Sequence, residues 1–230
     1  MRARQLTPTL VQLTRLRFVN AYLVREDDGF TLVDTTVPRG AGALLDAAAE
    51  AGAPIRRIAL THGHGHGDHV GSLDELRGRL DGELEVSMPE LDARIHAGEK
   101  VVEGKLPGSW PDIETAPDVR LEPGDRVGSL EVVGAPGHTP GHIAFLNTRD
   151  RTLLAGDVFT TYGGAAVASH FTFPFPLAAM ATWDKGLNLE SGRVLRALEP
   201  GLLAVGHGPA LRDPGPAMDR AIVRAHRALC

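Results

Sequence analysis

The chain has 230 residues, of which 43% are hydrophobic and 23% are charged, the balance of a globular protein with a sizeable core. Its 27 glycines and 16 prolines are too few for a collagen-like or low-complexity chain. A net charge of -5 without a long run of Lys or Arg argues against nucleic acid as a partner. The single cysteine, Cys230, cannot form an intrachain disulfide, so a cytoplasmic location is expected.

Hydrophobic periodicity and turn residues predict short strands and helices mixed along the chain. The predicted strands are 16–25, 30–34, 58–61, 84–87, 119–121, 130–134, 143–147, 152–155 and 202–205. The predicted helices are 41–51, 70–80, 90–97, 187–198 and 216–229. Residues 98–117 contain three prolines and are interpreted as a linker or excursion. Because no linker divides the chain cleanly, we expect one domain over residues 1–230, with sheets covered by helices.

Residues 158–183 form the longest uncharged run and have the length of a membrane span. Glycines and prolines within it would leave backbone groups without hydrogen-bond partners in lipid. We therefore expect no membrane association and interpret the run as a covering loop.

Residues 61–69 read Thr-His-Gly-His-Gly-His-Gly-Asp-His and hold four of the ten histidines. Glycine has no Cβ, so the alternating glycines allow the chain to fold tightly around an ion. Neutral imidazoles with a carboxylate suit Zn²⁺, Mn²⁺ or Fe²⁺, whereas a structural thiolate zinc site would need cysteines. The run alone is also compatible with a low-complexity tract that binds metals loosely.

Three later segments repeat one pattern, an apolar strand followed by a glycine and then a potential metal ligand. These segments lead to His138, Asp157 and His207. Open α/β sheets gather their sites beyond the C-terminal ends of strands, so we expect the three side chains to lie together. Combined with residues 61–69, they favour a specific metal centre over a loose tract.

These motifs resemble those of the metallo-β-lactamase-fold hydrolase superfamily, in its glyoxalase II-like and lactonase-like branch. The resemblance rests on Asp34 in Leu-Val-Asp-Thr, on residues 64–69, and on His138, Asp157 and His207, in the family's order. It implies an α/β (α+β) fold, a four-layer αββα sandwich with the site along one edge.

The same resemblance implies two divalent metal ions, with Zn²⁺ expected and Fe²⁺ or Mn²⁺ as alternatives. The first ion is assigned to His64, His66 and His138, the second to Asp68, His69 and His207, and Asp157 bridges the two. Two adjacent cations share one water and lower its pKa, so that a bridging hydroxide can attack the substrate. Asp68 and Asp157 are therefore expected to serve catalysis, while Asp34 is either a residue that orients a ligand or a turn residue at a strand end.

The histidine run departs from the family pattern by one additional His-Gly pair. Aligned from the left, His62 and His64 become the first two ligands, and aligned from the right they are His64 and His66. The right-hand register keeps the spacing between His66 and Asp68 and leaves His62 in a supporting position. It predicts that His66→Ala lowers metal content strongly and that His62→Ala lowers it much less.

The resemblance implies an enzyme, a dinuclear metal-dependent hydrolase of a small ester, thioester or lactone. No cysteine can supply the thiolate of some β-lactamase sites, and residues 208–230 leave room for one helix rather than a glutathione-binding domain. One alternative is a mononuclear Fe²⁺ oxidoreductase similar to persulfide dioxygenases, on His64, His138 and Asp157. The other is a non-catalytic metal-binding paralogue.

Three of the seven phenylalanines lie within residues 171–177, a loop stiffened by two prolines. We expect an apolar wall over a small-molecule substrate, or a homodimer contact that completes the site. Ordinary packing at the edge of the core is the alternative. The roles of Tyr162 and His170 are left open by the sequence.

Overall fold

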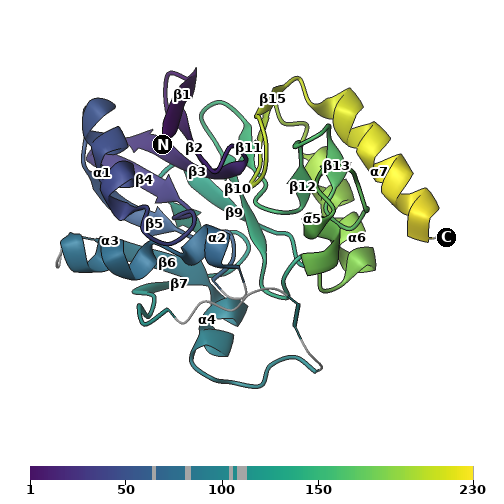
Figure 1. Ribbon diagram of the computed structural model, residues 1–230, viewed down its shortest axis with the longest axis horizontal. Helices are drawn as coiled ribbons and strands as arrows, with labels where there is room; N and C mark the ends of the chain where they lie inside the picture. Colours follow the sequence, from purple (N-terminus) through teal and green to yellow (C-terminus); the bar gives the residue numbers. More distant parts are fainter. Residues whose placement is uncertain (64–65, 81–83, 104–105, 108–112, 230) are drawn as a thin grey trace.

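The computed structural model describes residues 1–63, 66–80, 84–103, 106–107 and 113–229. Within these ranges two β-sheets pack face to face and helices cover both outer faces (Figure 1). Three apolar cores separate the layers, one between the sheets and one beneath each set of helices. The expected four-layer αββα architecture is therefore confirmed.

The first sheet has seven strands in the order β1 to β7. The strands are β1 (Arg2–Thr7), β2 (Leu10–Arg15), β3 (Val19–Glu26), β4 (Gly29–Val33), β5 (Ile55–Ala59), β6 (Glu85–Pro89) and β7 (Val119–Leu121). Strands β1 to β4 run antiparallel, and β4 to β7 run parallel. In β3, Leu23 faces the helices while Tyr22 and Val24 face the second sheet, because successive side chains of a strand point to opposite faces.

The second sheet has six strands in the order β15-β14-β11-β10-β9-β8. The strands are β8 (Arg126–Val127), β9 (Leu130–Gly134), β10 (Ile143–Asn147), β11 (Thr152–Leu154), β14 (Leu202–Ala204) and β15 (Leu211–Arg212). A separate pair, β12 (Phe159–Thr160) and β13 (Ala166–Val167), lies between β11 and β14 in the chain. An isolated bridge between Val19 and His207 connects the two sheets at one edge.

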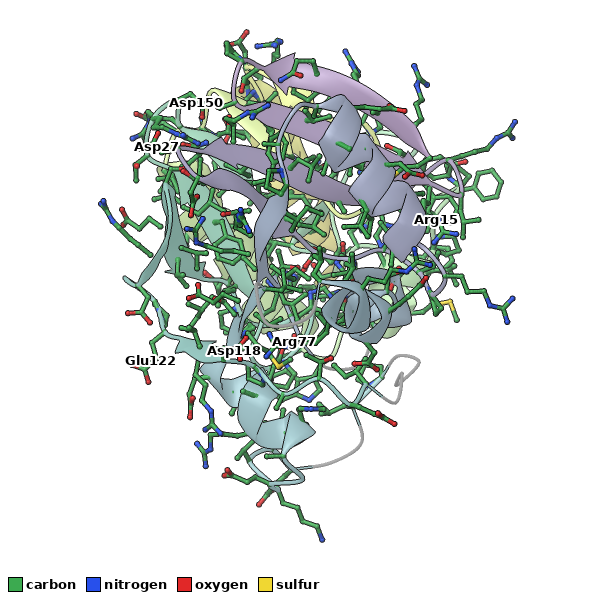
Figure 2. All side chains as sticks on the ribbon, turned by 90° about the vertical axis from the view of Figure 1, so that its left-hand side faces the viewer. Arg15, Asp27, Arg77, Asp118, Glu122 and Asp150 are labelled. Carbon is green, nitrogen blue, oxygen red and sulfur yellow. The ribbon has the colours of Figure 1, made fainter. Side chains whose placement is uncertain are left out.

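Helices cover the two sheets from opposite sides of the molecule (Figure 1). On the first sheet these are α1 (Ala41–Glu50), α2 (Gly67–Val70), α3 (Leu73–Arg79) and α4 (Glu90–His96), and after β13 come α5 (Leu177–Ala181), α6 (Lys185–Ala197) and α7 (Gly215–Leu229). Leu195 of α6 and Met218 of α7 are buried against the second sheet. On the other side, Arg77 of α3 forms a two-pronged ion pair with Asp118, at 2.7 and 2.8 Å, which ties that helix to the start of β7 (Figure 2).

The predicted helix over 70–80 corresponds to α3, and its first residue, Val70, is instead the end of the separate helix α2. A Cβ on Gly71 would lie 2.2 Å from the carbonyl oxygen of Gly67, and the Gly71 N–H donates to Thr36 outside the helix. The interpretation of residues 158–183 as a loop was incomplete, because they contain β12, β13 and α5. Within the described ranges, no helix has both the length and the hydropathy needed to cross a membrane.

Candidate metal centre

The candidate ligands gather at one edge of the sandwich, each beyond the C-terminal end of a strand. Four of them, His62, His66, Asp68 and His69, come after β5, while His138 follows β9, Asp157 follows β11 and His207 follows β14. Strands from both sheets therefore contribute to one site, as the repeated strand-glycine-ligand pattern predicts.

The first group consists of His62, His66 and His138, each of which offers a nitrogen within 4.8 Å of the other two. All three side chains are buried, and among the described residues none of their Nε2 atoms has a hydrogen-bond partner. Burial lowers the pKa of His66 to about 4 and holds that of His138 well below its usual range. The imidazoles are therefore neutral near pH 7, the form that binds metal ions.

The second group consists of Asp68, His69 and His207. His207 Nε2 lies 3.3 Å from Asp68 Oδ2. His69 donates from Nδ1 to Asp34 Oδ2 at 2.8 Å, so the Nε2 atom of the His69 ring points to the site. Asp34 also accepts from the backbone N–H and the hydroxyl of Thr61, at 2.9 and 2.8 Å. Asp34 thus orients a candidate ligand and the end of β5 together, rather than serving only as a turn residue.

Asp157 lies between the two groups. Its Oδ2 is 3.4 Å from His138 Nε2 in the first group, and 3.4 and 3.1 Å from the Nε2 atoms of His69 and His207 in the second. Two ligands at about 2.1 Å from one tetrahedral ion are about 3.4 Å apart, so these spacings fit a carboxylate shared by two ions. The Asp157 N–H donates to His142 Nε2 at 3.0 Å, which makes His142 a support for this carboxylate.

The histidines of the second group and the carboxylates beside them shift each other's pKa. Burial alone would lower the pKa of His207, but the Asp157 and Asp68 carboxylates together outweigh burial and raise that pKa to about 9. Burial would likewise raise the pKa of Asp157, yet His207 and His69 hold it well below its usual range. A bound cation replaces such protons and pairs with the same carboxylates. The buried Nε2 atoms and the buried carboxylate of Asp157 together fit divalent metal ions.

The first group contains His62, whereas the sequence predicted His64 at this place. Thr61 is held by Asp34, and its hydroxyl lies 3.1 Å from His62 Nδ1. His62 therefore lies three residues after the end of β5, beside a threonine that Asp34 holds in place. His64 lies outside the described residues, so its assignment stays a prediction, while His62 becomes a candidate ligand.

The loop that carries His207 is held from the first sheet. Asn20 Nδ2 donates to the carbonyl oxygens of Val205 and Gly208 at 2.9 and 2.7 Å, and Tyr22 Oη donates to Val205 at 2.7 Å. A Cβ on Gly206 would lie 2.1 Å from Asp157 Oδ1 and 2.6 Å from His69 Cε1. Only glycine fits at this position without displacing the site.

Asp92 of α4 is a site residue that the sequence analysis did not identify. It is fully buried, and its Oδ2 accepts from the Gly63 N–H at 2.8 Å; the N–H of Gly141 also donates to this carboxylate. Burial raises the pKa of Asp92 to about 7. Asp92 therefore connects the loop after His62 to the loop after His138, and a lone aspartate in a short helix gives no sequence signal for this role.

Aromatic side chains cover His207. The Phe175 ring lies 4.8 Å and the Phe18 ring 5.9 Å from the His207 ring, between centroids, and Tyr162 packs 5.3 Å from Phe18. Phe173, by contrast, is 90% exposed. Of the phenylalanines in the predicted wall, Phe175 reaches the site, and Phe18 and Tyr162 complete an aromatic cover that the sequence did not indicate.

Two sheets between helices, with paired His and Asp groups at one edge, define a metal-binding αββα protein. The family model of the metallo-beta-lactamase superfamily matches residues 14–207, and the chain belongs to this superfamily. The chain is 40% identical over 215 residues to the uncharacterized protein YobT of Bacillus subtilis, with 91% of both chains covered. It is 30% identical to the probable metallo-hydrolase YflN of the same organism, with 86% of this chain and 81% of YflN covered.

Among solved structures, TTHA1623 in a di-iron-bound form is similar to this chain. The two share 29% sequence identity with a TM-score of 0.65, over 90% of this chain and 95% of TTHA1623.

Proposed function

We propose that the chain is a dinuclear metal-dependent hydrolase of a small ester, thioester or lactone. The observation that carries this proposal is the position of Asp157 Oδ2, within 3.1–3.4 Å of Nε2 atoms from both groups. The likeness to a probable metallo-hydrolase supports hydrolysis, and the likeness to a di-iron protein makes iron an alternative to the expected Zn²⁺.

In this proposal each group of side chains holds one ion. His62, His66 and His138 would hold the first, Asp68, His69 and His207 the second, and Asp157 both. Two bound divalent cations lower the pKa of water and polarise a carbonyl group, which is the chemistry that ester hydrolysis needs.

The chain's own hydrogen bonds direct the histidine nitrogens toward the ions. Asp34 accepts from His69 Nδ1. The Thr182 hydroxyl donates to the Ala178 carbonyl at 2.7 Å and therefore accepts from His138 Nδ1 at 2.9 Å. In both histidines the proton is held on Nδ1, so the Nε2 lone pair is free for a metal ion.

Asp68 is the carboxylate of the site that is open to solvent. Its side chain is 31% exposed, against 4% for Asp34 and 3% for Asp157. We assign it two tasks, ligation of the second ion through Oδ2 and transfer of a proton to and from bulk water through its other carboxylate oxygen.

The test is a substrate panel with metal removal and restoration. Protein treated with a chelator and reloaded with Zn²⁺ or Fe²⁺ is assayed on esters, thioesters, lactones, phosphodiesters and a β-lactam. We expect hydrolysis of at least one of the first three classes, lost on chelation and regained on reloading. Oxygen consumption on a persulfide with no hydrolysis would overturn the proposal in favour of an oxidoreductase.

A further inference from the structure

A cavity of about 550 Å³ lies next to the loop that follows His207. Gln12 and Thr14 of β2 line it from the first sheet, and Tyr162, Gly208 and Pro209 line it from the metal side. Its remaining lining is cationic and consists of Arg2, Arg4 and Arg17.

Strand pairing brings two of the arginines to the same face as the cavity. In the antiparallel β1–β2 register, Arg2 is opposite Thr14 and Arg4 is opposite Gln12, and residues two apart in a strand point to the same side. Gln12 is buried and donates to the Gly208 carbonyl at 3.0 Å, so this face is directed at the loop after His207. Arg17 approaches from the turn between β2 and β3.

The structure gives these three guanidinium groups no counter-ion among the residues that it describes. Within the described part of the chain, no carboxylate pairs with Arg2, Arg4 or Arg17, whereas Arg57 and Arg77 are paired with Asp28 and Asp118. The chain as a whole carries a net charge of -5, so this cationic cluster is opposite in sign to the net charge of the chain. Guanidinium groups bind carboxylates and phosphates through paired, charge-assisted hydrogen bonds.

The cavity shares a wall with the candidate metal centre. Gly208 follows His207 directly in the chain, and the Tyr162 ring is linked to the His207 ring through Phe18, with centroid distances of 5.3 and 5.9 Å. A small molecule could therefore place one end at the metal centre and the other end among the arginines.

We propose that this arginine cavity binds an oxyanion of the substrate, a carboxylate or a phosphate, while the scissile carbonyl lies at the metal centre. The inference rests on the proposed hydrolase function and narrows it to acyl compounds that carry a negative charge at the end remote from the scissile bond.

The test compares matched substrates on metal-loaded protein. The 4-nitrophenyl monoester of glutaric acid carries a free carboxylate, its methyl ester is a neutral analogue, and a phosphonate of equal length distinguishes the two oxyanions. We expect the wild type to prefer an anionic substrate. The double variant Arg4→Gln/Arg17→Gln should raise the KM for the anionic substrate about tenfold and leave the KM for the neutral ester unchanged. Arg126→Gln, at an exposed arginine paired with Glu131 on the β8–β9 hairpin, is the control.

Equal kinetics of the wild type and the double variant on the charged and neutral esters would overturn the arginine cavity and leave the hydrolase function standing. If no substrate is hydrolysed, the proposed function fails. Calorimetric binding of glutarate and inorganic phosphate to the same proteins then tests separately whether the arginine cavity binds an oxyanion. Weaker binding to the double variant by about tenfold supports it, and unchanged binding overturns it.

Discussion

His62 and His66 both belong to the first group of candidate metal ligands. Because both rings are buried beside His138, we expect His62→Ala and His66→Ala to lower metal content equally, to about half of the wild-type value. This revises the smaller effect that the sequence alone predicts for His62. Metal analysis of both variants is the measurement, with His96→Ala on α4 as the control. A normal metal content in His62→Ala would restore the register with His64.

Asp92 gives a pH-dependent prediction. Burial raises its pKa in the folded protein to about 7 from the usual value of 3.8, so folding favours the protonated carboxyl. Its contribution to stability is complete below about pH 4 and is lost as the pH rises through about 7. Asp92→Asn cannot ionise, so its free energy of unfolding relative to the wild type should increase by roughly 1–3 kcal/mol from pH 5 to pH 8.

Urea unfolding of both proteins at several pH values measures this difference, and the pH dependence of the metal ligands cancels between them. Asp46→Asn, at an exposed position of α1, should show no trend. A difference that stays flat or decreases with pH for Asp92→Asn would contradict the assignment.

The sequence alone located those candidate ligands whose signal is a local pattern. Asp157 and His207 follow an apolar strand and a glycine, and this pattern alone located them correctly beyond strand ends. Thr182 and Asp92 could not be found in this way, because they act on residues 44 and 29 positions distant in the chain. Their roles depend on tertiary packing rather than on any local motif.

Among the single elements of the fold, the turn after β14 has room for no side chain at position 206. A methyl group at Gly206 would meet Asp157 Oδ1 at 2.1 Å, so Gly206→Ala must displace the shared carboxylate or the turn itself. We expect this variant to lose metal and to be destabilised by about 1–3 kcal/mol. Gly201→Ala, whose added Cβ would have no neighbour closer than 4.0 Å, should keep both properties. Thermal unfolding and metal analysis of the two variants test the requirement.

The loop before α5 separates two roles for phenylalanine. Phe175 is 6% exposed and packs on the His207 ring, whereas Phe173 is 90% exposed. We expect Phe175→Leu to raise KM for acyl substrates about threefold to tenfold, and Phe173→Leu to leave it unchanged. Steady-state kinetics on a short-chain and a long-chain ester measure both. Equal effects of the two substitutions would contradict the aromatic cover described for His207.

The elements that the sequence could not predict have identifiable physical reasons. Strand β1 is an exposed edge strand, and it lacks the alternation of apolar and polar residues that marks a half-buried strand. In β2 the alternation is interrupted by Gln12, a buried polar residue whose partner is the Gly208 carbonyl. By contrast, β10 is apolar on both faces and was predicted at its observed bounds, because it lies between two cores.

At the scale of the whole molecule, the two sheets act as a frame that brings distant loops to one edge. The first sheet supplies Asp34 and the loop after β5, and the second supplies His138, Asp157 and His207. The core between the sheets is continuous behind them, so the relative position of the two ligand groups depends on packing across the sandwich. The metal groups and their spacing are thus a property of the complete fold.

If two metal ions share Asp157, as we propose, each chain holds two ions, and the metal content per chain measures this. The wild type, loaded with excess Zn²⁺ and desalted, should retain two ions per chain as measured by mass spectrometry of the metal. Asp157→Asn should retain fewer than one, because the loss of this carboxylate weakens both sites, while Asp46→Asn should retain two. A wild type that saturates at one ion, or an Asp157→Asn variant that keeps two, would contradict the sharing of Asp157 by two ions.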